Sequence, residues 1–504
     1  MEPDATLPDN IILHVGQPKA GSTAIQNALD ANRDALLEQG VLFPRSVLRR
    51  SNPADPSRTP GHLDLLGQLA KKNADSFEVE LKKHAARTNK LVLSVENITL
   101  LGAHDPKVSA LASRLTGSNV KIIAVHRDAY EWYQAYYYEC VVGGIRNTVE
   151  PVASHLADVT NSDVLDFSER IQELAKVFNA TSVTILPFAS DDGTTLLERF
   201  LEAAGLDLPE ATTLSRRRVN VSFTTRPVVE THRWLNLFLG SMSREESLRF
   251  SQDMKAFYND LLLADSDLRS IPLLGTREGA NLKQAIGTND PATVSNLPPR
   301  NSATYRPAKS ESAAMVSILE KGLDTIALRS GGLQLANKNL NDVEGAKLWS
   351  VDELRLLMKE LTKASSICVH GDATALAVAA GAPGRMVLGL CPTTEQVIPL
   401  QAMFDSLQAA SPVLVRNYST LPATLTAVDL VVLGEALSDS GALSQLKPGL
   451  VILRVTAGQP VAPLPKAWNA QLCARVGGLR IYRAGEHTKS KREATAASLI
   501  RQTN

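Results

Sequence analysis

The chain has 504 residues, enough for about three domains of about 150 residues each or for two larger ones. Lys and Arg together number 53, as do Asp and Glu, so the formal net charge is zero, and 44% of the residues are hydrophobic. Ordinary globular proteins have this composition, which excludes disordered and fibrous chains. It also excludes a strongly basic nucleic-acid binder.

The cysteines and the N-terminal segment favour a reducing, cytoplasmic setting. The 4 cysteines lie far apart and form no C-x-x-C pair, which argues against a disulfide framework and against a cysteine zinc site. The opening MEPDATLPDN is acidic where a signal peptide is basic and apolar, and no apolar run reaches about 18 residues. We therefore expect a cytoplasmic protein with no transmembrane segment, no nucleic-acid partner and no metal.

The first part of the chain alternates apolar runs with helical stretches. Residues 11–16 read as a buried strand that breaks into a loop at residues 17–23, and a helix follows with apolar residues up to Leu37. Further strands are predicted at residues 91–94, 120–125 and 183–186, and a helix at 168–178. Strands separated by helices predict an α/β fold with a parallel sheet.

A second α/β region is predicted toward the C-terminus. Residues 263–310 are rich in Ser, Asn, Pro and Gly, typical of a linker, whereas charged residues become sparse after residue 365. Strands are expected at 367–369, 386–390, 413–415, 430–433 and 450–453, with a hairpin around Gly477 and Gly478. The expected organisation is a first domain at 1–262, a linker and helical connection at 263–349, a Rossmann-like domain at 350–485 and a polar tail at 486–504.

The loop at residues 16–23, Gly-Gln-Pro-Lys-Ala-Gly-Ser-Thr, has the features of a phosphate site. It follows a strand and opens a helix, so backbone N–H groups and the helix dipole converge on one anion-sized space. The motif G-x-x-x-x-G-K-[ST] of nucleoside triphosphatases requires lysine where this chain has Ser22, and the lysine lies earlier, at Lys19. Ordinary ATP or GTP hydrolysis is thus disfavoured. A simple Gly-Ser turn at a helix N-cap is the alternative.

The segment HVGQPKAGSTAIQ resembles the opening of sulfotransferases that use 3′-phosphoadenosine 5′-phosphosulfate (PAPS), in particular bacterial carbohydrate-sulfotransferase-like proteins with a P-K-T-G-[ST]-[ST] loop. LVLSVEN, VKIIAVHRDAYEWYQAYYYE and RRVNVS extend the resemblance over residues 10–260. The resemblance implies a P-loop fold and PAPS as the sulfuryl donor. It implies that the donor is held by Lys19, Gly21, Ser22 and Thr23 at the 5′-phosphosulfate and by Arg127 at the 3′-phosphate. Arg217, in the basic run at residues 216–218, is a further candidate to hold the 3′-phosphate or an anionic acceptor, and a solvated face is the alternative for this run.

The chain departs from the family pattern at one position, and the resemblance does not identify the general base. Ala135 stands where the family has a serine that contacts the 3′-phosphate, a loss of about 1 kcal/mol. Lys19 is expected to stabilise the leaving phosphate, with no metal demanded. Glu96, at the carboxyl end of a strand, and His62, with a pKa suited to proton removal, are the candidate bases, whereas His14 lies within a strand and is expected to be structural.

Residues 350–485 resemble a degenerate methyltransferase-like Rossmann domain that uses S-adenosylmethionine (SAM). The similarity lies in the pattern DLVVLGEAL, LKPGLVILRV and a terminal hairpin. The expected glycine-rich turn is replaced by residues 370–375, with the single glycine Gly371, and the acidic ribose ligand is replaced by Cys391. Asp372 and Glu435 are the residues to test for methylation, but an interaction or acceptor-positioning module is the stronger expectation.

The leading functional expectation is transfer of a sulfuryl group from PAPS to a hydroxyl of a carbohydrate or glycolipid acceptor. Two alternatives stay open. One is a catalytically decayed nucleotide-binding or interaction protein, and the other is a SAM-dependent methyltransferase with an accessory anion-binding domain.

Overall fold

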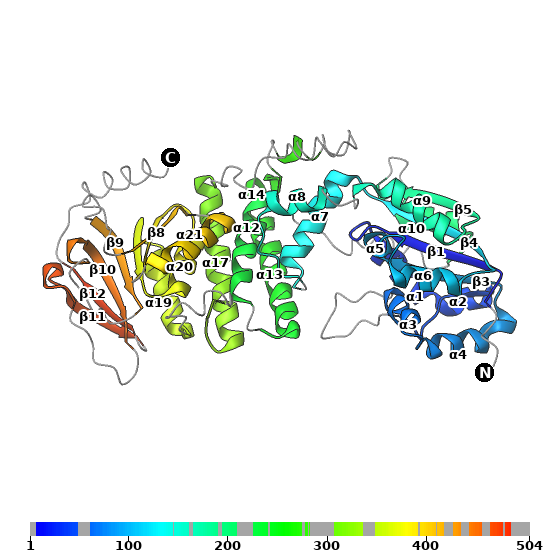
Figure 1. The fold of residues 1–504 in the computed structure, drawn as a ribbon, viewed down its shortest axis with the longest axis horizontal. Helices are drawn as coiled ribbons and strands as arrows, with labels where there is room; N and C mark the ends of the chain where they lie inside the picture. Colours follow the sequence, from blue (N-terminus) through cyan, green and yellow to red (C-terminus); the bar gives the residue numbers. More distant parts are fainter. Residues whose placement is uncertain are drawn as a thin grey trace. The chain divides into compact units, whose positions relative to one another are not determined.

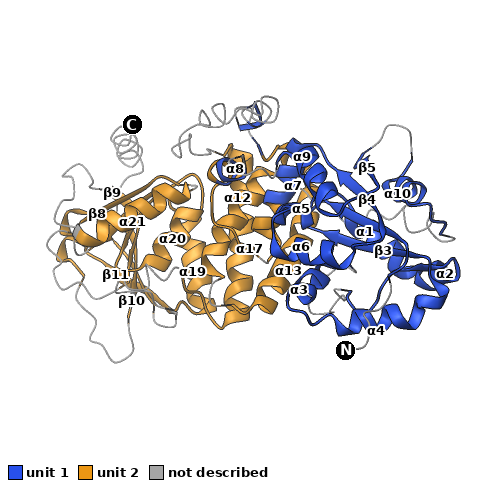
Figure 2. Cartoon of the chain, turned by 45° about the vertical axis from the view of Figure 1, so that its right-hand side comes forward, with its two compact units in different colours: residues 1–137, 155–222, 274–297 blue, residues 138–154, 223–273, 298–504 orange. Residues whose placement is uncertain are grey.

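The computed structural model divides the chain into two compact units, shown in blue and orange in Figure 2. Unit 1 comprises residues 1–137, 155–222 and 274–297, and unit 2 comprises residues 138–154, 223–273 and 298–504. The structure describes residues 7–48, 61–144, 146–160, 165–189, 194–208, 225–239, 242–274, 278–280, 282, 307–335, 348–391, 394–409, 411–417, 427–434, 443–455, 464–476 and 479–484.

Unit 1 is built on a parallel five-stranded sheet with the order β2-β3-β1-β4-β5. The strands are β1 (Asn10–Gly16), β2 (Val41–Leu42), β3 (Lys90–Glu96), β4 (Asn119–His126) and β5 (Ser182–Pro187). Four of the five match strands predicted from the sequence. The fifth strand, β2, has two residues, which are too few to show the alternating pattern of a strand in the sequence. The chain leaves β1 toward β2 and later crosses to β4 on the other side, so the sheet has its switch point at the carboxyl end of β1.

Helices cover both faces of this sheet (Figure 1). One face packs against α1 (Ser22–Ala31), α2 (Arg33–Glu38) and α10 (Leu196–Ala204). The other packs against α3 (Leu63–Ala70), α4 (Asp75–His84), α6 (Pro106–Arg114) and α9 (Phe167–Val177). The single helix expected after the loop is two helices, because the chain leaves helical geometry at Asn32 (φ −104°). Shorter or connecting elements are α5 (Ile98–Leu101), α7 (Ala129–Val142), α8 (Val152–Thr160) and the 3-10 turn Ala85–Arg87.

Unit 2 contains a seven-stranded sheet with the order β11-β12-β10-β9-β6-β7-β8. Its strands are β6 (Ser366–His370), β7 (Met386–Cys391), β8 (Val413–Asn417), β9 (Ala427–Leu433), β10 (Lys447–Arg454), β11 (Gln471–Val476) and β12 (Leu479–Arg483). Strands β6 to β10 pair in parallel, whereas β12 runs antiparallel to both β10 and β11. The predicted strands are therefore confirmed, and the chain has the expected α/β class in both units. Strands β11 and β12 form the expected antiparallel pair, whereas Gly477 and Gly478 between them lie outside the described residues.

The helices of unit 2 begin before residue 262, where the sequence placed the end of the first domain. They are α12 (Arg226–Leu235), α13 (Arg244–Ala264), α14 (Ser266–Ser270), α17 (Lys309–Ser330), α19 (Val351–Leu361), α20 (Ala373–Gly381) and α21 (Thr394–Leu407), with 3-10 turns at Asn236–Phe238, Leu443–Gln445 and Lys466–Trp468. Residues 223–273 therefore belong to unit 2 rather than to the expected domain at 1–262. The 22-residue helix α17 lies in the segment at 263–349 that was expected to be a linker and helical connection.

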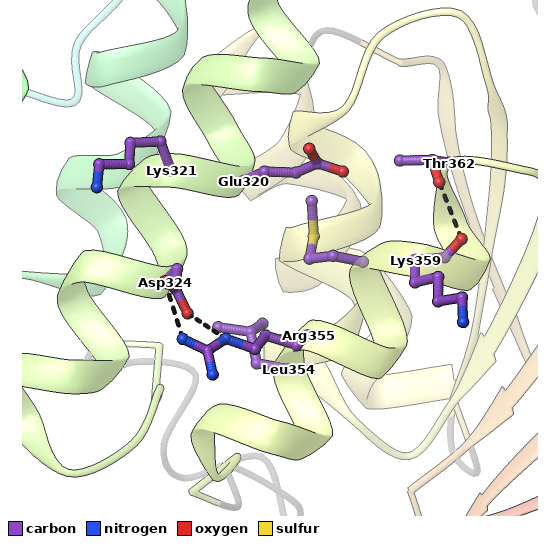
Figure 3. A pocket seen from close by; sticks show the side chains of 8 residues that line it. Glu320, Lys321, Asp324, Leu354, Arg355, Lys359 and Thr362 are labelled. Atoms are coloured by element: carbon purple, nitrogen blue, oxygen red, sulfur yellow. Dashed lines mark hydrogen bonds and ion pairs between the residues drawn. The ribbon is translucent and has the colours of Figure 1, made fainter. Parts of the chain in front are cut away.

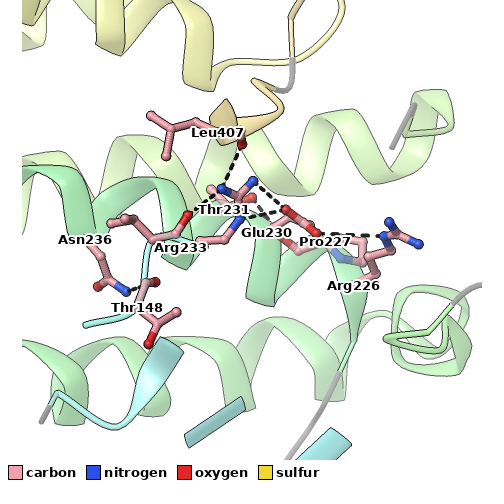
Figure 4. Close-up of polar contacts among 9 residues, drawn as sticks. Thr148, Arg226, Pro227, Glu230, Thr231, Arg233, Asn236 and Leu407 are labelled. Atoms are coloured by element: carbon pink, nitrogen blue, oxygen red, sulfur yellow. Dashed lines mark hydrogen bonds and ion pairs between the residues drawn. The ribbon is translucent and has the colours of Figure 1, made fainter. Parts of the chain in front are cut away.

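Packing of α12 explains this difference in boundary. All ten of its residues are buried, and the Trp234 indole N–H donates to the carbonyl of Ala377 in α20 at 2.8 Å. The buried Arg233 pairs with Glu230 at 2.8 Å and donates to the carbonyl of Leu407 at 2.8 Å (Figure 4). A buried arginine is stable only when it is fully paired in this way. Such contacts tie α12 to the elements around the second sheet.

Candidate anion-binding site

The loop between β1 and α1 takes a shape suited to an anion. Gly21 is the N-cap of α1 in the left-handed region (φ 86°), and no side chain caps the helix. Lys19 also has a positive φ of 65°, uncommon for a residue with a side chain. The turn is closed by the Ala20 N–H, which donates to the carbonyl of Gln17 at 3.2 Å. The N-terminal N–H groups of a helix without a side-chain cap favour a negative group.

Two glycines allow the close packing of this loop. A Cβ at Gly16 would lie 3.0 Å from the Ser22 hydroxyl oxygen, so the Ser22 side chain turns back against the end of β1. A Cβ at Gly21 would lie 2.8 Å from a methyl group of Leu196 and would be strained by the positive φ. The loop is therefore shaped by both glycines, and Gly21, Ser22 and Lys19, the residues expected to hold phosphosulfate, lie together in it.

Two polar atoms in the loop are buried and lack a hydrogen-bond partner among the residues that the structure describes. They are the Ser22 hydroxyl oxygen, in a residue 1% exposed, and the Gln17 Nε2, in a residue 2% exposed. Leaving such a group without a partner costs about 1–3 kcal/mol. A phosphate or sulfate oxygen would accept from both groups, so the residues present fit the phosphosulfate end of PAPS.

Arg127 follows β4 and is tied to the loop. Its Nη1 donates to the carbonyl of Lys19 at 3.0 Å, and its backbone N–H donates to the Gln17 Oε1 at 3.0 Å. The guanidinium lies over the Phe188 ring, 4.8 Å from the centroid, and its Nε is 3.4 Å from Glu131. The side chain remains 22% exposed. It thus presents a positive charge at the edge of the sheet where the loop lies.

The aromatic residues of α7 mostly form a packed face. Trp132, Tyr133 and Tyr137 are fully buried, and the Trp132 indole N–H donates to the carbonyl of Pro18 at 2.8 Å. Tyr136 stacks on Trp132 with ring centroids 4.9 Å apart and an interplanar angle of 13°. These contacts favour packing, with Trp132 supporting the loop from the side of α7.

Glu96 lies next to the loop. It ends β3, and its partner in the parallel register with β1 is Gly16, the residue that opens the loop. Neighbouring strands in a sheet lie about 4.8 Å apart. The backbone of Glu96 and the first residue of the loop therefore lie at the same edge of the sheet. The side chain is half-buried and lies on the same face of β3 as Ser94, because side chains alternate along a strand. This placement suits a carboxylate that acts beside the anion.

His62, the other candidate base, is enclosed by the fold. It is fully buried, its Nδ1 accepts from the Ser94 N–H at 2.9 Å, and its Nε2 donates to the carbonyl of Pro44 at 2.9 Å. Burial lowers the pKa of His62 to about 4. Both ring nitrogens are used by the backbone, and the imidazole is neutral. The geometry therefore favours Glu96 over His62 as the base.

His14 is likewise a buried strand residue, as the sequence indicated. Its Nδ1 lies 2.8 Å from the Ser94 hydroxyl, and Gln26 donates to the same hydroxyl at 3.0 Å. Burial lowers the pKa of His14 to about 3. Ala135 is buried at 5% exposure, and Arg217 lies outside the described residues, so its role stays a prediction.

The loop of unit 2 that resembles a SAM site is filled by the chain itself. Asp372 caps α20: one carboxylate oxygen accepts from the Ala375 N–H at 2.8 Å and the other from the Trp349 indole N–H at 2.9 Å. A Cβ at Gly434 would lie 2.5 Å from the carbonyl oxygen of Gly371, which shows how tightly the two strand ends pack. These residues do not fit a SAM cofactor. Glu435 lies outside the described residues.

A separate hollow of about 450 Å³ lies between α17 and α19 in unit 2 (Figure 3). Arg355 and Asp324 pair across it at 2.7 Å, and Leu354 and Met358 form its apolar part. Burial raises the pKa of Glu320 on its wall. The charges of both signs and the internal ion pair give this hollow no preference for an anion.

Two further observations concern metals and membranes. Within the residues that the structure describes, no group of three or more His, Cys, Asp or Glu side chains is arranged to hold a metal ion. Across the same residues, no helix is long and apolar enough to cross a bilayer.

No protein-family model and no curated protein matches the chain. The N-terminal domain of EvdMO1, crystallised with SAH and D-fucose, is 12% identical over 29% of this chain and 69% of that chain, with a TM-score of 0.17. The PezAT toxin-antitoxin system of Streptococcus pneumoniae is 16% identical over 42% of this chain and 84% of that chain, with a TM-score of 0.19. The Pyrococcus furiosus Hef helicase domain is 13% identical over 89% of this chain and 93% of that chain, with a TM-score of 0.14. Similarities this weak carry no functional argument.

Proposed function

We propose that the chain is a sulfotransferase that moves a sulfuryl group from PAPS to a hydroxyl of a carbohydrate or glycolipid. The observation that carries this proposal is the buried Ser22 hydroxyl, which lacks a partner among the described residues and lies at an uncapped helix N-terminus beside Lys19. A helix start with an unsatisfied buried donor is completed by an anionic ligand. The resemblance of the HVGQPKAGSTAIQ segment supplies the identity of that anion.

The loop would stabilise the leaving group. The Lys19 ammonium and the first N–H groups of α1 would stabilise the negative charge that develops on the 5′-phosphate as its bond to sulfur breaks. Arg127, which is fixed against the loop by the Lys19 carbonyl, would hold the 3′-phosphate. Thr23, in the first turn of α1, adds a further hydroxyl beside Ser22. The products are the sulfated acceptor and adenosine 3′,5′-bisphosphate.

Glu96 would act as the general base. The acceptor oxygen forms a bond to sulfur while its proton passes to the Glu96 carboxylate, and the bond between sulfur and the 5′-phosphate oxygen breaks. The support for this role is the register that pairs Glu96 with Gly16 at the carboxyl edge of the sheet, where ligands of open α/β sheets bind. Because Lys19 lies in this loop and Glu96 lies beside the residue that opens it, the reacting atoms would lie between a cation and a base.

Transfer from labelled PAPS tests this function and also reports the acceptor. We expect label to appear in carbohydrates or glycolipids of a cell-envelope extract with the wild-type protein and to be lost with Lys19→Ala. Lys71→Ala, which changes an exposed lysine of the same unit, is the matched control and should leave transfer unchanged. Binding of the nucleotide without any transfer would instead support a catalytically decayed nucleotide-binding protein.

A further inference from the structure

We propose that Gln17 is a ligand-binding residue of the phosphate loop, whose side-chain NH₂ group donates a hydrogen bond to an oxygen of the phosphosulfate. This inference rests on the proposed function and adds a donor that the loop motif does not predict, because the motif specifies no residue type at the position between Gly16 and Pro18. The inference stands on three observations: a fixed amide orientation, a buried donor and a link to Arg127.

Hydrogen bonding fixes the orientation of the Gln17 amide. The backbone N–H of Arg127 lies 3.0 Å from the Gln17 Oε1, and a backbone N–H can only donate. The side-chain atom facing it must therefore be the carbonyl oxygen, so a flipped amide is excluded. The other end of the amide is an NH₂ group, which donates and cannot accept.

Burial leaves this NH₂ group in need of an acceptor. Gln17 is 2% exposed, and its Nε2 has no hydrogen-bond partner among the residues that the structure describes. Gln26 provides a contrast within the same unit, because its Nε2 donates to the Ser94 hydroxyl at 3.0 Å. A donor-only group in the loop selects a ligand with acceptor oxygens, and phosphate and sulfate oxygens fit this requirement.

Contacts within the loop hold Gln17 and the two cationic residues in one arrangement. Gln17 Oε1 accepts from the backbone of Arg127, and the Arg127 guanidinium donates to the Lys19 carbonyl. The Gln17 carbonyl also accepts from the Ala20 N–H, which closes the turn. The amide is thus preorganised for binding. Its NH₂ group supplies a neutral hydrogen bond to the anion in addition to the positive charge of Lys19.

Titration calorimetry with adenosine 3′,5′-bisphosphate tests the assignment through Gln17→Glu. This variant keeps an oxygen to accept from Arg127 and replaces the NH₂ donor with a second carboxylate oxygen. We expect an affinity at least about tenfold weaker than that of the wild type at pH 8. Gln39→Glu makes the same charge change at the end of α2, where the glutamine donates to the carbonyl of Asp207, and should bind like the wild type.

A second measurement separates ligand binding from a structural role. Protonation of the introduced carboxylate restores an O–H donor, so the affinity gap between wild type and Gln17→Glu should narrow from pH 8 to pH 5. Affinity within twofold of wild type at pH 8, or a gap that does not change with pH, would overturn the assignment while leaving the proposed function intact. Wild-type protein that does not bind the bisphosphate would overturn both.

Discussion

The Arg127 guanidinium donates to the backbone carbonyl of Lys19 across 3.0 Å, which joins the end of β4 to the loop that follows β1. Lys19 has a left-handed backbone, and this contact helps to hold it there. Lys19 of the loop, the neighbouring Arg127 and the start of α1 therefore lie together at the switch point of the sheet.

Substitutions of Lys19 separate backbone strain from ligand binding. A positive φ costs a residue with a side chain about 1–2 kcal/mol, and glycine avoids this cost. We expect Lys19→Gly to be about 1 kcal/mol more stable than Lys19→Ala in denaturant unfolding, while both lose affinity for adenosine 3′,5′-bisphosphate by at least about tenfold. Equal stability of the two variants would show that the left-handed backbone carries no strain.

Arg127→Lys keeps the positive charge but removes the planar guanidinium that contacts Lys19 and lies over Phe188. If Arg127 holds the 3′-phosphate, affinity for adenosine 3′,5′-bisphosphate should fall about tenfold, whereas affinity for adenosine 5′-phosphate should change little. Competition binding with the two nucleotides measures this ratio. An equal loss for both would place Arg127 in loop support rather than at the 3′-phosphate.

Substitution of Glu96 or His62 by glutamine shows which of the two residues is the general base. A glutamine at position 62 can keep both contacts of His62, because its oxygen accepts from the Ser94 N–H and its NH₂ group donates to the carbonyl of Pro44. We therefore expect His62→Gln to have a kcat within about threefold of the wild-type value. Glu96→Gln removes the base and should lower kcat by about 10²-fold or more. Single-turnover sulfuryl transfer checks both. The reverse ranking would make His62 the base.

Stability should depend on pH through the buried histidines. Burial lowers the pKa values of His14 to about 3 and His62 to about 4, from an ordinary value of 6.5. Between about pH 6.5 and pH 4 the unfolded chain binds protons that the folded chain does not, so stability falls as the pH falls, by up to about 1.4 kcal/mol per pH unit for each histidine. Urea unfolding of wild type and His62→Gln at several pH values measures this, with a shallower slope expected for the variant.

A substitution of Asp372 tests whether the loop at residues 370–375 has a structural role rather than a SAM-binding role. Asp372→Asn keeps the cap on Ala375 but places an NH₂ group against the Trp349 indole N–H, so two donors face each other. We expect a loss of about 1–3 kcal/mol in stability and no change in bisphosphate binding. Wild-type protein should give no calorimetric signal with SAM. A SAM affinity that is lost in Asp372→Asn would contradict this reading.

Local sequence patterns predicted most strands and the loop, because both depend on residues close in the chain. The apolar runs of β1, β4 and β10 and the Lys19 to Thr23 segment carry their own signals. The boundary at residue 262 failed because the burial of α12 depends on α17 and α20, which lie far along the chain. The buried NH₂ group of Gln17, which lacks a partner among the described residues, was equally hidden, because the orientation of the amide is set by Arg127, 110 residues away.

The most direct test of the central claim is calorimetric titration of the whole chain with adenosine 3′,5′-bisphosphate. Lys19 and Ser22 in the loop, together with the neighbouring Arg127, predict saturable binding at one site per chain in the wild-type protein. This binding should be weakened at least about tenfold in Lys19→Ala and unchanged in Lys71→Ala. Absence of binding by the wild-type protein at millimolar nucleotide, or equal binding by Lys19→Ala, would contradict the claim.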